Sequence, residues 1–137
     1  MGDWYTIGVL LGGGVGLGVI LAGLLAVSTR GLVIAIVIGL ALSGLLTLGF
    51  GWEESVAAAI GAVVGAVSGS VVVQGALRRG GTRLGVGGFM GLAGLMIMLL
   101  SGIPLVGYVL AVVVPLFAAR VRGQQPTRFA GLRALDK

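Results

Sequence analysis

The sequence contains no cysteine and no histidine, and only four of its 137 residues are acidic. Without cysteine, the chain cannot form a disulfide and offers no thiolate as a metal ligand or nucleophile. Without histidine, it lacks the side chain that most often acts as a general base near neutral pH. We therefore expect no enzyme activity, no metal site and no cofactor.

Charged residues are also scarce. They make up 9% of the chain, whereas 58% of the residues are hydrophobic and the mean hydropathy is +1.18. So little polar surface cannot cover a water-soluble globule of this length. The composition predicts an all-α integral membrane protein. The net charge of +5 lies in short segments between apolar runs, which indicates orientation in a membrane and not nucleic-acid binding.

Charges and turn residues divide the chain into five apolar runs. The last uncharged run, from Leu84 to Ala119, is too long for one crossing, and the segment Ser101–Pro104 divides it because its glycine and proline favour a turn. Pro115 should kink the fifth helix or mark its inner end. We predict a transmembrane domain over residues 1–120 and a basic amphipathic tail over residues 121–137. The predicted spans are residues 5–27, 31–51, 55–77, 84–101 and 104–119.

The positions of the charges predict the orientation. With five transmembrane helices and the N-terminus outside, all nine lysines and arginines fall on one side, which would be the cytoplasmic side of a plasma membrane. Glu53 and Glu54 then lie outside, and the C-terminus is cytoplasmic. A chain with four crossings would send the basic tail outward. A re-entrant hairpin in place of the last two crossings would satisfy the charges equally well.

Small residues recur at four-residue spacing and form smooth stripes on several of these helices. Such stripes let two backbones approach closely, and van der Waals contact is what holds helices together in lipid. We expect eight glycines to pack against neighbouring helices: Gly8, Gly12, Gly16, Gly39, Gly61, Gly65, Gly69 and Gly91. Either every stripe is used inside one bundle, or one of the stripes at residues 8–16 and 61–69 faces a second copy in a homo-oligomer.

Two glycine patterns suggest further relationships. A displacement of 53 residues aligns Gly12 with Gly65 and Gly16 with Gly69, which predicts two helical hairpins in a parallel repeat, followed by one more helix. The glycines at positions 12, 14, 16 and 18 form a pattern that resembles the first helix of rotary ATPase c-subunits. That resemblance covers one helix only. No predicted span contains the carboxylate that ion-coupled rotation needs, so that activity is excluded.

Few polar side chains lie within the predicted spans, and none of them belongs to aspartate, glutamate, lysine, arginine or histidine. Proton relays and ion-coupled transport normally need ionisable groups at depth, so both are excluded. A polar lining could be built from Ser43, Thr47, Ser68, Ser70 and Gln74. Gln74 either makes an interhelical hydrogen bond, contacts the loop at Thr29 or Thr82, or lines such a passage.

Arginines lie near the inner ends of the predicted spans, where we expect them to attract anionic lipid headgroups: Arg30, Arg78, Arg79 and Arg83. The loop at residues 78–83 also contains two glycines that could cradle phosphate, although it lacks the pattern GxxxxGK[ST]. Apart from the lipid bilayer and its anionic headgroups, the sequence leaves two other partners open: a second copy of the chain, and a protein that would bind the basic tail.

Two functions fit these observations. The first is a non-catalytic structural or accessory membrane protein held together by close glycine packing. The second is a small channel or passive transporter for small neutral or weakly charged solutes, formed between copies of the chain or between the repeat halves. The absence of intramembrane charge leaves only passive passage for the second function.

Overall fold

The computed structural model describes residues 3–45 and 48–123. The regular secondary structure in this part of the chain consists of five α-helices: α1 (Asp3–Leu25), α2 (Thr29–Leu45), α3 (Trp52–Arg78), α4 (Arg83–Leu100) and α5 (Pro104–Gly123). Four of them, α1, α3, α4 and α5, are long and apolar enough to cross a membrane. The prediction of an all-helical chain is confirmed for this part of the chain, and four of its helices are able to span a membrane. The predicted amphipathic tail, from residue 124 onward, lies outside the described residues.

α2 is shorter than the predicted second span. The prediction carried this helix to residue 51, but residues 48–51 are not part of an α-helix, and the described part of α2 covers Thr29–Leu45. Gly49 and Gly51 follow shortly afterwards, and glycine disfavours a continued helix.

The last apolar run divides where the sequence predicted. α4 ends at Leu100 and α5 begins at Pro104. Ser101 is the C-cap of α4, and its Oγ donates a hydrogen bond of 2.7 Å to the Met98 carbonyl. α5 continues past Pro115 to Gly123, so the expectation that this proline could mark the inner end of the helix is wrong. A membrane-type helix tolerates an internal proline when neighbouring groups satisfy the freed carbonyl.

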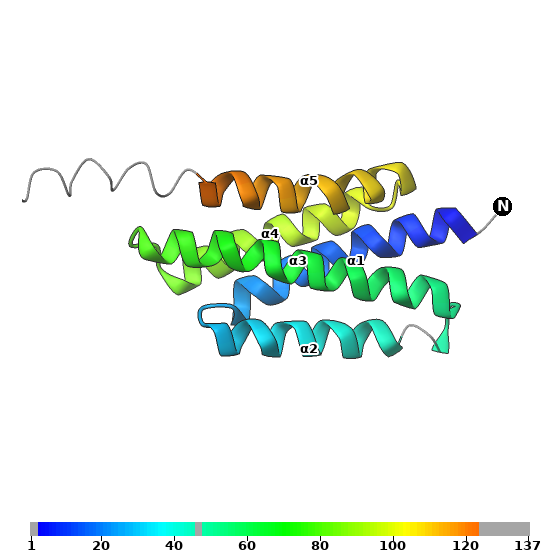
Figure 1. Cartoon of the computed structure of the whole chain (residues 1–137), viewed down its shortest axis with the longest axis horizontal. Helices are drawn as coiled ribbons and strands as arrows, with labels where there is room; N and C mark the ends of the chain where they lie inside the picture. Colours follow the sequence, from blue (N-terminus) through cyan, green and yellow to red (C-terminus); the bar gives the residue numbers. More distant parts are fainter. Residues whose placement is uncertain (1–2, 46–47, 124–137) are drawn as a thin grey trace, which may run out of the picture.

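α1 is the central helix of the bundle and contacts each of the other four helices. The connections alternate between the two ends, so α1, α3 and α5 run in one direction and α2 and α4 in the other (Figure 1). α3 packs along α1 and also contacts α2, α4 and α5. The core is therefore built around a parallel pair, α1 and α3.

Glycines of α1 bring its backbone against that of α3. A Cβ atom added to Gly14 would collide with the carbonyl oxygen of Ala58, and one added to Gly18 would collide with that of Ala62. These collisions are with backbone atoms, which cannot rotate out of the way. The two helices therefore pack as closely as they do only because these positions have no side chain.

The contact is reciprocal. A Cβ on Gly61 would collide with the carbonyl oxygen of Leu11, and one on Gly65 with that of Val15. In all four contacts, the carbonyl lies three residues before a glycine of the facing helix. Gly14 thus corresponds to Gly61 and Gly18 to Gly65, which is a displacement of 47 residues in both pairs. α1 and α3 therefore meet in a register of 47 residues.

The other face of α1 packs against α4 and α5. A Cβ on Gly12 would lie 2.7 Å from the Cα of Gly107 in α5, and one on Gly16 would lie 2.6 Å from the carbonyl oxygen of Gly94 in α4. The carbonyl of Gly8 would collide with a Cβ added to Gly107. Both stripes considered as faces for a second copy are therefore covered by helices of the same chain.

Gly39, Gly69 and Gly91 differ in their surroundings. A Cβ on Gly39 would lie 3.1 Å from the Cβ of Ala62, and one on Gly69 would lie 2.8 Å from the Cβ of Ala22. A Cβ on Gly91 would have no neighbour within 4 Å. Gly91 therefore takes no part in a helix contact of this structure, contrary to expectation. The rotation of α4 places the side chain of Met90, which is only 4% exposed, in the interface instead.

Candidate functional site

Polar side chains inside the helices bond mainly to their own backbone. The Oγ of Ser43 donates to the Gly39 carbonyl at 2.8 Å, and the Oγ of Ser70 donates to the Val67 carbonyl at 2.7 Å. Such bonds satisfy a hydroxyl without any partner on another helix. Ser68 is also buried, but two residues of helix separate it from Ser70, so the two side chains point to roughly opposite faces of α3. Thr47 lies outside the described residues.

The described arginines gather at one end of the bundle, where the α1–α2 and α3–α4 connections and the end of α5 meet (Figure 1). All of them are exposed: Arg30, Arg78, Arg79, Arg83, Arg120 and Arg122. We call this end the basic end. Glu53 and Glu54 lie at the opposite end, at the start of α3. The two signs of charge are thus separated along the long axis.

The helix dipoles favour the position of the acidic residues but oppose the position of two of the arginines. Glu53 and Glu54 lie in the first turn of α3, where an acid is favoured by the positive end of the dipole. Arg83 is the first residue of α4 and Arg30 the second of α2. An arginine there opposes the dipole, at a cost of about 0.3–1 kcal/mol. The guanidinium groups make the basic end positive, while the C-termini of α1, α3 and α5, which also lie there, contribute the negative ends of their dipoles.

The α3–α4 connection does not form the phosphate cradle considered from its sequence. Gly80 has a φ of +88°, and its N–H donates to the Leu77 carbonyl at 3.1 Å. The N–H of Gly81 donates to the Ala76 carbonyl at 3.0 Å. These two bonds close the end of α3 in the manner of a Schellman motif. Both glycine amides are used by the protein itself.

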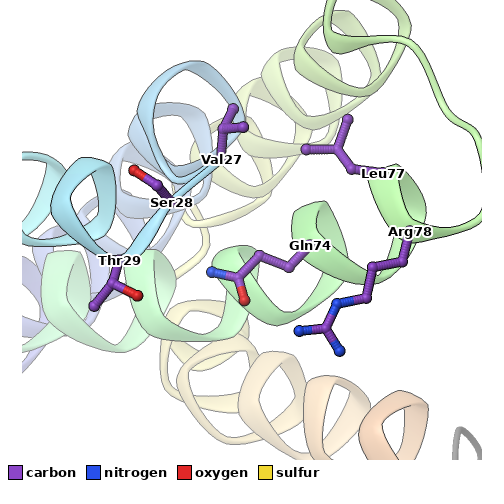
Figure 2. Close-up of a pocket in the computed structure, with 6 residues that line it drawn as sticks. All are labelled: Val27, Ser28, Thr29, Gln74, Leu77 and Arg78. Carbon is purple, nitrogen blue, oxygen red and sulfur yellow. The ribbon is translucent and has the colours of Figure 1, made fainter.

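A pocket opens at the basic end, between the α1–α2 turn and the last turns of α3 (Figure 2). It has a volume of about 470 Å³ and is lined by Val27, Ser28, Thr29, Gln74, Leu77 and Arg78. Gln74 thus lies across from the turn that contains Thr29, which was one of the positions expected for it. The pocket joins an amide, a guanidinium and two hydroxyls with two apolar side chains.

Aromatic residues mark the opposite end. The hydroxyl of Tyr108 donates to the Trp4 carbonyl at 2.9 Å, and the rings of Trp4 and Tyr5 meet edge to face with their centroids 6.4 Å apart. Trp52, at the start of α3, is 72% exposed. Tryptophan and tyrosine are enriched at membrane–water interfaces. This end therefore has the composition of an interfacial layer.

These groups also bear on metal binding. Across residues 3–45 and 48–123, no cluster of three or more histidine, cysteine or acidic residues could hold a metal ion. The strongest features are the close packing of α1 on α3 and the polar pocket at the basic end. No protein-family model matches the chain, and no curated protein or solved structure matches it.

Proposed function

We propose that this chain is a non-catalytic integral membrane protein that serves as a structural or accessory component. The observation that carries the proposal is the closure of the bundle interior. Along the reciprocal glycine contacts, α1 and α3 touch backbone to backbone, which leaves no room for a solute between them. The buried serines that could have lined a passage, Ser43 and Ser70, donate to carbonyls of their own helices.

In the proposed arrangement, all five helices cross a plasma membrane, with the N-terminus outside and the C-terminus in the cytoplasm. The position of every described arginine at one end supports this orientation through the positive-inside bias. Exposed Val33, Ile34 and Val37 on α2 suit contact with lipid.

Flux through liposomes tests the proposed function. Purified chain is reconstituted into liposomes, and the passage of water, small neutral solutes and monovalent ions is compared with that of empty liposomes. We expect no flux above the empty liposomes. Flux that appears with the native chain and is abolished in Gln74→Leu would replace the proposal by a passive channel formed between copies of the chain.

Single cysteines test the orientation, because the native chain has none. Gly49 and Gly123 are suitable positions, since a Cβ on either has no neighbour within 4 Å. We expect Gly49→Cys to react in intact cells with an impermeant maleimide, and Gly123→Cys to react only after permeabilisation. Reaction of both from the outside would contradict five crossings.

A third cysteine distinguishes full crossings of α4 and α5 from a re-entrant hairpin. Ile103, in the turn between these helices, is 57% exposed. If both helices cross fully, Ile103→Cys reacts from the outside as Gly49→Cys does. Protection of Ile103→Cys on both sides of the membrane would indicate a turn buried within the bilayer.

A further inference from the structure

We infer that the pocket at the basic end binds the phosphate of an anionic lipid headgroup, with Arg78, Gln74 and Thr29 as its polar contacts. The inference rests on the proposed insertion of the chain in a membrane, which puts this pocket at a surface of the bilayer in either orientation. It goes beyond a general attraction between arginines and lipid, because it assigns one bound headgroup to defined side chains.

Two donors come from one face of α3. Gln74 and Arg78 are four residues apart, so their side chains lie one above the other on the helix. Figure 2 shows the Gln74 amide extending toward the α1–α2 turn and the Arg78 guanidinium on the same side of α3. Within the described part of the chain, the Gln74 side chain makes no hydrogen bond, so its donors are available. A guanidinium fork beside an amide suits the oxygens of a phosphate.

The opposite wall of the pocket is the start of α2. The Oγ of Ser28 accepts a hydrogen bond of 3.2 Å from the N–H of Gly31 and so caps this helix. The remaining amides of a first helical turn have no carbonyl within the helix, and they form the positive end of its dipole. Thr29, the first residue of α2, adds a hydroxyl to the pocket. An anion in the pocket would thus be attracted from both walls.

The remaining lining favours a lipid over free phosphate. Val27 and Leu77 give the pocket an apolar wall beside its polar groups, and a free phosphate would leave that wall unused. The volume of about 470 Å³ lies within the range of about 300–1,000 Å³ that is typical of small-molecule sites. The described acidic side chains, Glu53 and Glu54, lie at the other end of the bundle and do not oppose an anion here.

Native mass spectrometry of the purified full chain in detergent tests the assignment. The probe is dioleoylphosphatidylglycerol, and dioleoylphosphatidylcholine serves as the comparison. We expect one phosphatidylglycerol to be retained with higher affinity than phosphatidylcholine. Arg78→Gln should weaken its binding by about tenfold or more, since it removes a charge-assisted contact. Thr29→Val, which keeps the side-chain shape, should weaken it several-fold.

Two further variants separate a site from diffuse attraction. Arg79→Gln removes the same charge from the next residue, which does not line the pocket. It should weaken lipid binding by no more than about fivefold, because this is the effect of one basic residue near a membrane surface. Gln74→Leu changes no charge, so diffuse attraction predicts no effect, whereas the site predicts a several-fold loss. Equal losses in Arg78→Gln and Arg79→Gln, with none in Gln74→Leu, would overturn the inference.

Two controls complete the test. Gel filtration and far-UV circular dichroism establish that each variant folds. In a separate experiment, excess inorganic phosphate is added to the chain with its bound phosphatidylglycerol. We expect the lipid to stay bound. Its displacement by phosphate would overturn the assignment of the pocket to a lipid headgroup. These measurements are made in detergent and need no particular orientation. Solute flux through liposomes or inverted cysteine labelling would therefore refute the proposed function without deciding whether the lipid site exists. Conversely, the absence of specific lipid binding would overturn the lipid site without refuting the proposed function.

Discussion

Replacing Gly65 by alanine is expected to force α1 and α3 apart. The new Cβ would lie 2.8 Å from the carbonyl carbon and 2.9 Å from the Cα of Val15, and closer still to its carbonyl oxygen. Ordinary contacts begin at 3.4 Å, so α3 must withdraw by at least about 0.6 Å, the difference between 3.4 and 2.8 Å. The atoms that it meets belong to backbone, and no change of rotamer can relieve the collision.

Two opposing effects set the size of the change. Overpacking of this kind typically costs about 1–3 kcal/mol. Alanine is more favourable than glycine inside a helix by about 1 kcal/mol. We therefore expect Gly65→Ala to lower the free energy of unfolding by between zero and about 2 kcal/mol, since the helix preference offsets part of the collision.

Gly91→Ala is the matched control, because a Cβ at that position in α4 has no neighbour within 4 Å. It should gain the helix preference without the collision and raise the free energy of unfolding by up to about 1 kcal/mol. The difference between the two variants, about 1–3 kcal/mol, isolates the helix contact. Unfolding by sodium dodecyl sulfate in mixed micelles, followed by far-UV circular dichroism, measures both. Equal effects at the two positions would refute the role assigned to backbone contact.

Three other substitutions probe single contacts. Gly107→Ala places a Cβ against the Gly8 carbonyl, so hydrogen exchange in α5 should become faster while that in α2 stays unchanged; slow exchange in α5 would contradict this contact. Gly80→Ala puts a side chain on a residue with a φ of +88° and should destabilise the chain by about 1 kcal/mol in the same unfolding assay. Tyr108→Phe removes the 2.9 Å bond to the Trp4 carbonyl and should cost no more than about 1 kcal/mol, given the exposure of the pair.

The helices could largely be predicted from the sequence because charge and turn residues punctuate an otherwise apolar chain. The division between α4 and α5 depended on Gly102 and Pro104, whose effects on the backbone are local. The end of α2 was placed too late, at residue 51, although residues 48–51 are not part of an α-helix. Charge marks only where a membrane-spanning run must stop, whereas Gly49 and Gly51 disfavour a helix before the next charge is reached.

The pocket could not be predicted in the same way. Its lining comes from two segments, residues 27–29 and residues 74–78, which are brought together only by the packing of α3 along α1. Gln74 stood out in the sequence as a polar residue near the inner end of a span, and Thr29 was one of its expected neighbours. For the role of Ser28 as a helix cap, the sequence offers no signal other than the residue type and its position before a helix.

The alternating glycines of α1 explain why this helix is central. Residues two apart on a helix point in nearly opposite directions. Gly14 and Gly18 accordingly face α3, while Gly12 and Gly16 face α5 and α4. A stripe at four-residue spacing predicts that a helix has one smooth face, and two such stripes offset by two residues predict a helix covered on both sides. The sequence contains this pattern at positions 12–18, but it does not show which helix covers which face. The pairing of helices depends on the 47-residue register between α1 and α3, which only the reciprocal contacts with Gly61 and Gly65 reveal.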